Sequence, residues 1–457
     1  MTPVSKRSRW RWLVWAVLYA LGVLYVSTVV SVYGFRPAHF DLAEGWRRFL
    51  LVRYIDHGSD QRADWTANLL MIVPLGWMLT AWLWPRQRFG WRVPAALAAL
   101  LLALAYVLAV KFIQLWFPRT VTVNYITAQA IGAAIGVLAY ALGHQFVGRA
   151  VHHMHFGGRS GLVVTLSFAS LAAGVFTLVP FDIIVSAQDF NERLAALPRF
   201  LLSIPGDARS VGVRGVLVLG AIGLVVPMGM LLEVLRPGRS YQLIALTGLV
   251  AMTALLVPSL FVISSQPALI SIPIHVIGFV AGAWVMRWLA DRDISLARPW
   301  LVRGAWFMVL PYLALLLVTN GLASTVWKSL ATALADPINP NRIWPLWTYY
   351  NISKAQAIAS LATHVAMYLP IGVLVWAIAG AGRGRAWLAA SLGLLLATAM
   401  ECGRWLRPGL IPDINNLAVG ALAAYCGVRF AAFAWALVIN LARERKSQPR
   451  RGLGRYL

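Results

Sequence analysis

The chain has 457 residues, of which 60% are hydrophobic and 12% are charged, and its mean hydropathy is +0.70. This composition excludes an ordinary water-soluble globular protein and an intrinsically disordered one, and it is typical of a polytopic membrane protein. The net charge of +24 would fit a nucleic-acid-binding protein, but no long polar region remains that could form a nucleic-acid-binding surface. We therefore predict an all-α integral membrane protein with no nucleic-acid partner.

Apolar windows of about 20 residues, long enough for a helix to cross a bilayer, recur along the whole sequence. We place twelve of them, near residues 12–33, 65–84, 93–117, 122–147, 161–180, 211–235, 241–263, 270–290, 302–320, 356–379, 386–406 and 414–440. Basic residues precede the first window and no small-residue cleavage site follows it. It is therefore predicted to be a retained anchor rather than a signal peptide.

Basic residues are concentrated in the segments that join alternate spans. They occur from Arg86 to Arg92, from Arg383 to Arg385, and in the C-terminal tail from Arg443 to Arg455. Lys and Arg are enriched in the cytoplasmic loops of membrane proteins. The sequence therefore predicts a multi-pass protein of the cell membrane with both termini in the cytoplasm.

Two short motifs occur three times in the same order. The first is Pro-x-Gly, at Pro74 and Gly76, at Pro227 and Gly229, and at Pro370 and Gly372. The second places small residues four apart, as Gly132 with Gly136, Gly278 with Gly282, and Gly420 with Ala424. We predict three parallel four-helix repeats, residues 1–150, 151–295 and 296–457, the last with a basic cytoplasmic tail. The glycine pairs are expected to form helix-packing seams.

Each repeat also has a long outer loop with an amphipathic stretch, which we expect to lie along the outer membrane interface. The apolar residues that mark the three stretches are Leu42, Trp46, Phe49 and Leu50; Phe190, Leu194, Leu197 and Leu201; and Trp327, Leu330 and Leu334.

The last repeat contains ionisable residues within apolar sequence. Glu401, Arg404 and Arg407 are spaced by three, so one helical face carries a carboxylate and two guanidinium groups. A Pro-Gly pair ends that helix, and Asp413 comes near the positive N-terminus of the next one. Ionisable residues in membrane segments commonly mark functional sites. Two questions stay open. Glu401 and Arg404 either form a site or only neutralise each other, and Asp413 either takes part in that site or only caps its helix.

The other repeats differ at the corresponding positions. The first repeat has Asn68 where the third has His364, and Lys111 where the third has Glu401, followed by Gln114 and Arg119. The second repeat has no carboxylate in its last two helices and is predicted to be a scaffold. These polar positions all lie at the outer ends of their helices, where arginine forks suit phosphate or carboxylate groups. The candidate ligand-binding residues are Arg404, Arg407, Asn416, Asn68, Lys111, Gln114 and Arg119, and the candidate catalytic residues are His364, Glu401 and Asp413.

The pattern resembles the VanZ-like family, whose members carry an Asn before a Pro-x-Gly helix, then a segment with Glu, Gln or Arg, and then an Asp before a glycine-spaced last helix. The matching residues are Asn68, Pro74 and Gly76 in the first repeat, and Glu401, Arg404, Asp413 and Gly420 in the third. The first repeat departs from the pattern with Lys111 and Tyr125 at the positions of the two acids, so the third is the preferred site. The family takes its name from a protein linked to resistance against teicoplanin, a lipoglycopeptide. The resemblance implies cell-envelope biology, including glycopeptide resistance or envelope polysaccharides, and no settled biochemical activity.

Three functions remain open. The leading one is a non-enzymatic envelope protein that binds an anionic lipid or a lipid-linked glycan at the outer leaflet. The second is a membrane enzyme that acts on a lipid-linked phosphate or ester, with His364 as base and Glu401 or Asp413 as its partner. The third is a lipid transporter or flippase, which needs a polar path through the membrane. The sequence predicts neither an oligomeric state nor a cofactor, and we interpret His152, His153 and His155 as loop residues rather than metal ligands.

The predicted topology can be tested with two single-cysteine variants, Arg88→Cys and Asp336→Cys, in a chain in which Cys402 and Cys426 are replaced by serine. An impermeant thiol reagent added to intact cells is expected to label the cysteine at 336 and not the one at 88, because the basic loop is retained inside. Labelling at 88 but not at 336 would reverse the topology.

Overall fold

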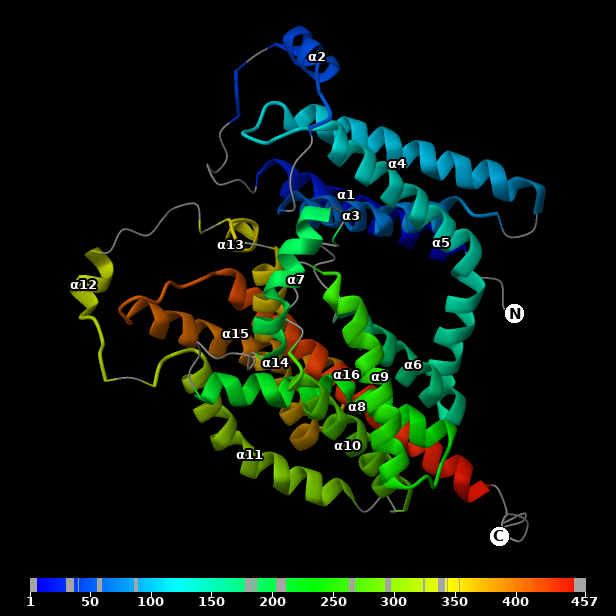
Figure 1. Cartoon of the computed structure of the whole chain (residues 1–457), viewed down its shortest axis with the longest axis vertical. Coiled ribbons are helices and arrows are strands. Elements are labelled where there is room, and N and C mark those ends of the chain that lie inside the picture. The colour runs from blue at the N-terminus through cyan, green and yellow to red at the C-terminus, as the bar shows by residue number, and fades with distance from the viewer. Residues whose placement is uncertain are drawn as a thin grey trace. The chain divides into compact units, whose positions relative to one another are not determined.

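The computed structural model describes residues 6–29, 37–39, 41–55, 60–85, 89–176, 184, 187–202, 211–262, 268–291, 297–323, 325–335, 342, 344–352 and 354–447. The regular elements in these residues are helices (Figure 1). Arg88 and Asp336, which serve the topology test, lie outside them.

Twelve of the described helices are long and apolar enough to cross a membrane, which confirms the predicted number of spans. They are α1 (Lys6–Thr28), α3 (Asp60–Leu83), α4 (Arg92–Gln114), α5 (Val123–Phe156), α6 (Gly158–Phe176), α8 (Val211–Leu235), α9 (Tyr241–Leu260), α10 (Ser271–Asp291), α11 (Ala297–Thr319), α14 (Lys354–Ala379), α15 (Arg383–Trp405) and α16 (Asn415–Ser447). The assignment of His152, His153 and His155 to a loop is wrong, because α5 continues as a helix through Phe156.

Shorter helices lie between the spans: α2 (Leu42–Leu50), the 3-10 turn η1 (Phe89–Trp91), α7 (Ala187–Leu202), α12 (Leu330–Ala335) and α13 (Trp347–Tyr350). α2 and α7 contain the first two predicted amphipathic stretches, and α12 contains the third except for Trp327, which precedes it. Trp46, Leu194 and Leu334 expose their apolar side chains. Asp41 starts α2 by accepting a 2.7 Å hydrogen bond from the Glu44 backbone N–H. Their placement at the outer interface stays a prediction.

The chain divides into two compact units, which we describe separately. The first unit contains Met1–Arg149, Pro180–Ile184 and Asn339–Ala357, and the second contains Ala150–Val179, Val185–Ile338 and Ile358–Leu457. The long segment of the first unit ends at Arg149, one residue before the predicted boundary at 150. The unit also includes short parts of the second and third predicted repeats. The organisation as three repeats stays a prediction.

The core of the first unit lies between α1, α3 and α4. Val23, Ile72, Leu75 and Val107 are almost completely buried in it. Tyrosine hydroxyls join the helices. Tyr19 of α1 donates to the Met71 carbonyl of α3 at 2.8 Å, and Tyr106 of α4 donates to the Ala20 carbonyl of α1. Such bonds between helices satisfy polar groups that lipid cannot. The positions of α1, α3 and α4 relative to one another are therefore fixed by both packing and hydrogen bonds.

Glycines allow close backbone contact between the two motif-bearing helices in each set. In α5, a Cβ atom at Gly132 or Gly136 would overlap with the backbone carbonyls of Leu69 or Val73 in α3. The same arrangement joins α8 to α10 through Gly278 and Gly282, which face the backbone of α8. The predicted packing role of these two glycine pairs is therefore seen directly.

The third set uses a different glycine. Gly372 of α14 meets the backbone of Ala424 and Gly427 in α16, whereas Gly420 faces Ala397 of α15 and the ring of Tyr368. Gly427 was outside the aligned motif. The backbone contact between α14 and α16 therefore includes Ala424 of the predicted pair, and Gly427, one turn further along α16, takes the place of Gly420.

The glycine seam can be tested with two matched substitutions in α5. Gly132→Ala forces a methyl group into the Leu69 carbonyl and is expected to destabilise the protein by about 1–3 kcal/mol. Gly143→Ala meets nothing within 4 Å and is expected to be neutral or stabilising, because alanine favours the helix by up to about 1 kcal/mol over glycine. Thermal unfolding of the purified variants in detergent measures the difference. Equal midpoints would show that the close contact does not matter for stability.

Candidate ligand-binding site

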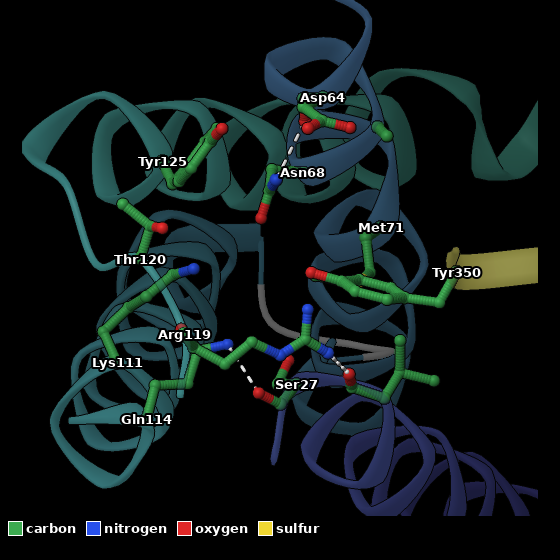
Figure 2. A pocket seen from close by; sticks show the side chains of 12 residues that line it. Ser27, Asp64, Asn68, Met71, Lys111, Gln114, Arg119, Thr120, Tyr125 and Tyr350 are labelled. Atoms are coloured by element: carbon green, nitrogen blue, oxygen red, sulfur yellow. Dashed lines mark hydrogen bonds between the residues drawn. The ribbon is translucent and has the colours of Figure 1, made fainter. Parts of the chain in front are cut away.

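Four helix ends of the first unit meet around a cavity. These are the C-terminal ends of α1 and α4 and the N-terminal ends of α3 and α5. The cavity has a volume of about 340 Å³ (Figure 2). Its lining residues are Val26, Ser27, Asp64, Ala67, Asn68, Met71, Lys111, Gln114, Arg119, Thr120, Tyr125 and Tyr350. It thus brings together the four ligand-binding candidates of the first repeat.

Gln114 and Arg119 are held by the end of α1. The last carbonyls of a helix have no partner within the helix, and here Gln114 Nε2 donates to the Ser27 carbonyl at 2.9 Å while Arg119 Nη2 donates to the Val26 carbonyl at 2.5 Å. The guanidinium carbon of Arg119 lies 3.8 Å from the centre of the Tyr350 ring. Burial lowers the pKa of Arg119 to about 10, and the charge of Asp64 opposes that effect. The guanidinium group therefore remains positively charged at neutral pH.

Lys111 is the most unusual residue of the cavity. It lies in the last turn of α4, where the helix dipole favours a cation, and it is only 3% exposed. Its ammonium group lies 5.6 Å from the centre of the Tyr125 ring and makes no hydrogen bond or ion pair with any residue that the structure describes. A buried charge without a partner is costly. The cavity therefore presents a cation that a bound anion would stabilise.

Asn68 has both sides of its amide engaged. Its Nδ2 donates to the Asp64 carbonyl and its Oδ1 accepts from Gln129 Nε2, each at 2.8 Å. Asn68 therefore connects α3 to α5 and fixes the wall of the cavity.

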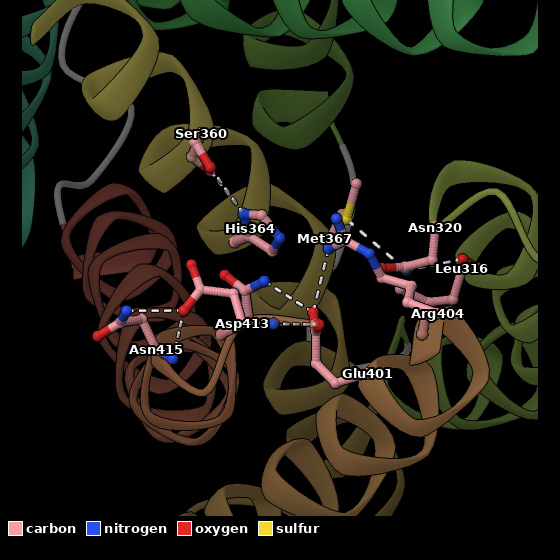
Figure 3. Close-up of polar contacts among 10 residues, drawn as sticks. Leu316, Asn320, Ser360, His364, Met367, Glu401, Arg404, Asp413 and Asn415 are labelled. Carbon is pink, nitrogen blue, oxygen red and sulfur yellow. Dashed lines mark hydrogen bonds and ion pairs between the residues drawn. The ribbon is translucent and has the colours of Figure 1, made fainter. Parts of the chain in front are cut away.

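Glu401, Arg404 and Asp413 of the third repeat lie together in the second unit (Figure 3). Glu401 is 5% exposed and accepts three hydrogen bonds. They come from Arg404 Nη1 at 3.2 Å, from the Asp413 backbone N–H at 2.8 Å and from Asn416 Nδ2 at 2.7 Å. Glu401 therefore ties the end of α15 to the segment that begins α16.

Asp413 and Arg407 are also engaged with their surroundings. One oxygen of Asp413 accepts from the Asn415 backbone at 2.9 Å and from the Asn415 side chain at 2.7 Å, which is a local cap at the start of α16. Arg407 donates to the Val326 carbonyl at 3.0 Å and lies 6.0 Å from the Trp327 ring. These contacts fit a structural role for both residues.

His364 is close to this cluster but makes different contacts. Its Nδ1 lies 2.7 Å from the Ser360 carbonyl oxygen, one turn earlier in α14. Among the described residues, neither ring nitrogen forms a hydrogen bond with Glu401 or Asp413, although Figure 3 shows the ring facing them. The pairing that a catalytic His–carboxylate unit requires is therefore absent from this arrangement.

The structure thus separates the sequence candidates into two groups. Asn68, Lys111, Gln114 and Arg119 line a cavity in the first unit, whereas His364, Glu401, Arg404, Arg407, Asp413 and Asn416 belong to the second unit. Sequence reasoning missed Ser27, Asp64, Thr120 and Tyr350 in the cavity wall. Asp64 could have been found from its spacing, because it lies four residues before Asn68 and so on the same face of one helix. No local signal connects Tyr350 with the first repeat, because it comes from a distant part of the chain.

The structural role of Glu401 predicts a loss of stability in Glu401→Gln. The new amide N–H₂ replaces an acceptor that faces N–H donors, so the free energy of unfolding should fall by about 1–3 kcal/mol. Glu44→Gln is the control, because its ion pairs with Arg47 and Arg48 are at the surface and contribute little. Thermal unfolding in detergent gives the comparison. An unchanged midpoint for Glu401→Gln would favour the alternative that the cluster serves ligand binding.

Comparison with known proteins finds a family match over the region that forms the cavity. Residues 16–144 match the model of the VanZ/LLP1 family. Neither a curated protein nor a solved structure matches the chain. The matched region runs from α1 into α5 and contains every cavity residue except Tyr350. The protein is a multi-pass membrane protein, and its residues 16–144 are similar to the VanZ/LLP1 family.

Proposed function

We propose that this VanZ-like protein binds a membrane amphiphile with a phosphate or carboxylate headgroup in the cavity between α1, α3, α4 and α5. Lys111 and Arg119 bind the anion, and Gln114 and Asn68 keep the cavity wall in place. The protein acts by binding an anionic lipid or a lipid-linked glycan of the cell envelope, without a chemical reaction.

The observation that carries this proposal is the state of Lys111. A lysine that is 3% exposed and has no hydrogen-bonding or ion-pairing partner among the described residues lowers stability. A charged ligand offsets that cost by forming the missing ion pair, and charge-assisted hydrogen bonds are among the stronger ones. Arg119 adds a second cation with donors suited to oxyanions.

The position of the cavity favours a membrane ligand. It opens among the ends of four helices that are apolar enough to span a bilayer, so its depth corresponds to the headgroup layer. By the charge distribution of the loops, we expect this end to be extracytoplasmic. An envelope lipid or glycan carrier is available there, which connects the proposal with envelope polysaccharides and with the glycopeptide resistance after which the family is named.

The acidic cluster of the second unit supports this function less well. Glu401 and Asp413 already accept hydrogen bonds from neighbouring backbone and amide groups, and the His364 ring contacts Ser360. The preferred site of the sequence analysis therefore moves from the third repeat to the first. No contact among the described residues favours the enzyme or the transporter over the binding protein.

The proposal predicts opposite effects of Lys111→Met on stability and binding. Methionine keeps the length of the side chain and removes the charge, so the protein should unfold at the same or a higher temperature. Binding of phosphatidylglycerol with a fluorescent acyl chain to the purified protein should weaken by roughly tenfold or more, as expected for the loss of a charge-assisted bond.

Lys328→Met is the matched control, because it removes the same charge from the second unit and should bind as the wild type does. Full binding by Lys111→Met would refute the proposed site. Weak binding combined with a lower unfolding temperature would show that Lys111 serves the fold instead.

A further inference from the structure

The cavity carries charges of both signs. Its lining contains two cations, Lys111 and Arg119, and one carboxylate, Asp64. Asp64 comes from the start of α3, and in Figure 2 it lies apart from the Arg119 guanidinium, toward the other end of the cavity. The negative charge of Asp64 raises the pKa of Arg119, whereas burial lowers it. The cavity therefore has a cationic end and an acidic end.

Two hydroxyl groups add to the lining. Ser27 is 5% exposed, and neither its hydroxyl nor that of Thr120 makes a hydrogen bond with a residue that the structure describes. Hydroxyls both donate and accept. They can therefore bind the phosphate or a polar substituent attached to it.

The size of the cavity excludes a good fit to a bare phosphate. A volume of about 340 Å³ is within the range of pockets that hold a small organic molecule. A phosphate alone would bind at the cationic end and leave the acidic end of the cavity unfilled, and a carboxylate can accept several hydrogen bonds in addition to those it already makes. A substituent with hydrogen-bond donors fills the remaining space and binds the carboxylate.

We infer that the headgroup is a phosphodiester whose second substituent carries hydrogen-bond donors, with the phosphate at Lys111 and Arg119 and the donors at Asp64. This inference rests on the proposed function and narrows its ligand class. The donors are hydroxyl groups, as in a glycerol or sugar phosphate, or an ammonium group, as in phosphoethanolamine.

The test uses two pairs of lipids, each matched in charge. Phosphatidylglycerol and phosphatidylmethanol are both monoanions, and only the first has hydroxyl donors in its headgroup. Phosphatidylethanolamine and phosphatidylcholine are both zwitterions, and only the first has N–H donors. Native mass spectrometry of the full chain with each lipid measures the affinities. The wild type is expected to prefer the donor-bearing lipid of at least one pair by roughly tenfold, and the pair that shows it distinguishes hydroxyl from ammonium.

Asp64→Asn tests the residue. The variant should bind phosphatidylmethanol more tightly, because a like charge is gone, and its preference for the donor-bearing lipid should fall several-fold. Asp41→Asn, which replaces an acid at the N-cap of α2, should keep the wild-type preference. An unchanged preference in Asp64→Asn would overturn the role of Asp64.

The wild-type measurements also decide the inference without any variant. Equal affinities within both pairs would overturn it and leave the proposed function standing, provided that Lys111→Met weakens all four lipids. If none of the four lipids binds, both the inference and the proposed function are overturned.

Discussion

The close approach of α3 and α5 is the constraint on which the site of the first unit depends. Gly132 and Gly136 let the α5 backbone touch the backbone of α3 at Leu69 and Val73. Asn68 directly precedes Leu69 in α3 and Asp64 lies one turn earlier, and the hydrogen bond between Asn68 and Gln129 joins the same two helices. In a bilayer, where lipid offers no polar partners, small residues and such bonds are what hold helices at a fixed distance. This contact therefore sets the spacing of α3 and α5, two of the helices whose ends line the cavity.

The two units solve the problem of a buried charge differently. In the second unit, the Glu401 carboxylate accepts hydrogen bonds from a guanidinium group, a backbone N–H and an amide, so its charge is compensated by the protein itself. In the first unit, Lys111 stands at the corresponding place in the sequence and has a tyrosine ring nearby but no acid bonded to it among the described residues. Removing a partner from such a compensated buried charge destabilises the fold. The uncompensated cation is the feature on which the proposed binding site rests.

The end of α1 connects the fold to the cavity of the first unit. Its last carbonyl groups need donors from outside the helix, and Gln114 and Arg119 supply them. The same contacts orient Arg119 so that one face of its guanidinium group packs on Tyr350. Tyr350 belongs to α13, a four-residue helix far along the chain, so the wall of the cavity is completed by a segment outside the region that matches the VanZ/LLP1 family.

The sequence by itself determined that the protein is a membrane protein with twelve spans, and it singled out Asn68, Lys111, Gln114 and Arg119 as candidate site residues. It also determined the packing role of the glycine pairs Gly132 with Gly136 and Gly278 with Gly282. These features depend on local composition and spacing, which are visible in one segment at a time. Only the tertiary structure decided that Lys111 lacks a partner among the described residues while Glu401 has three. It also showed that Asp64, Ser27 and Tyr350 share a cavity with Lys111, and that Gly427 meets the backbone of α14 where Gly420 meets only the Tyr368 side chain of that helix. The physical reason is that hydrogen-bond satisfaction and burial depend on groups brought together from distant parts of the chain, and no local pattern records which of them meet.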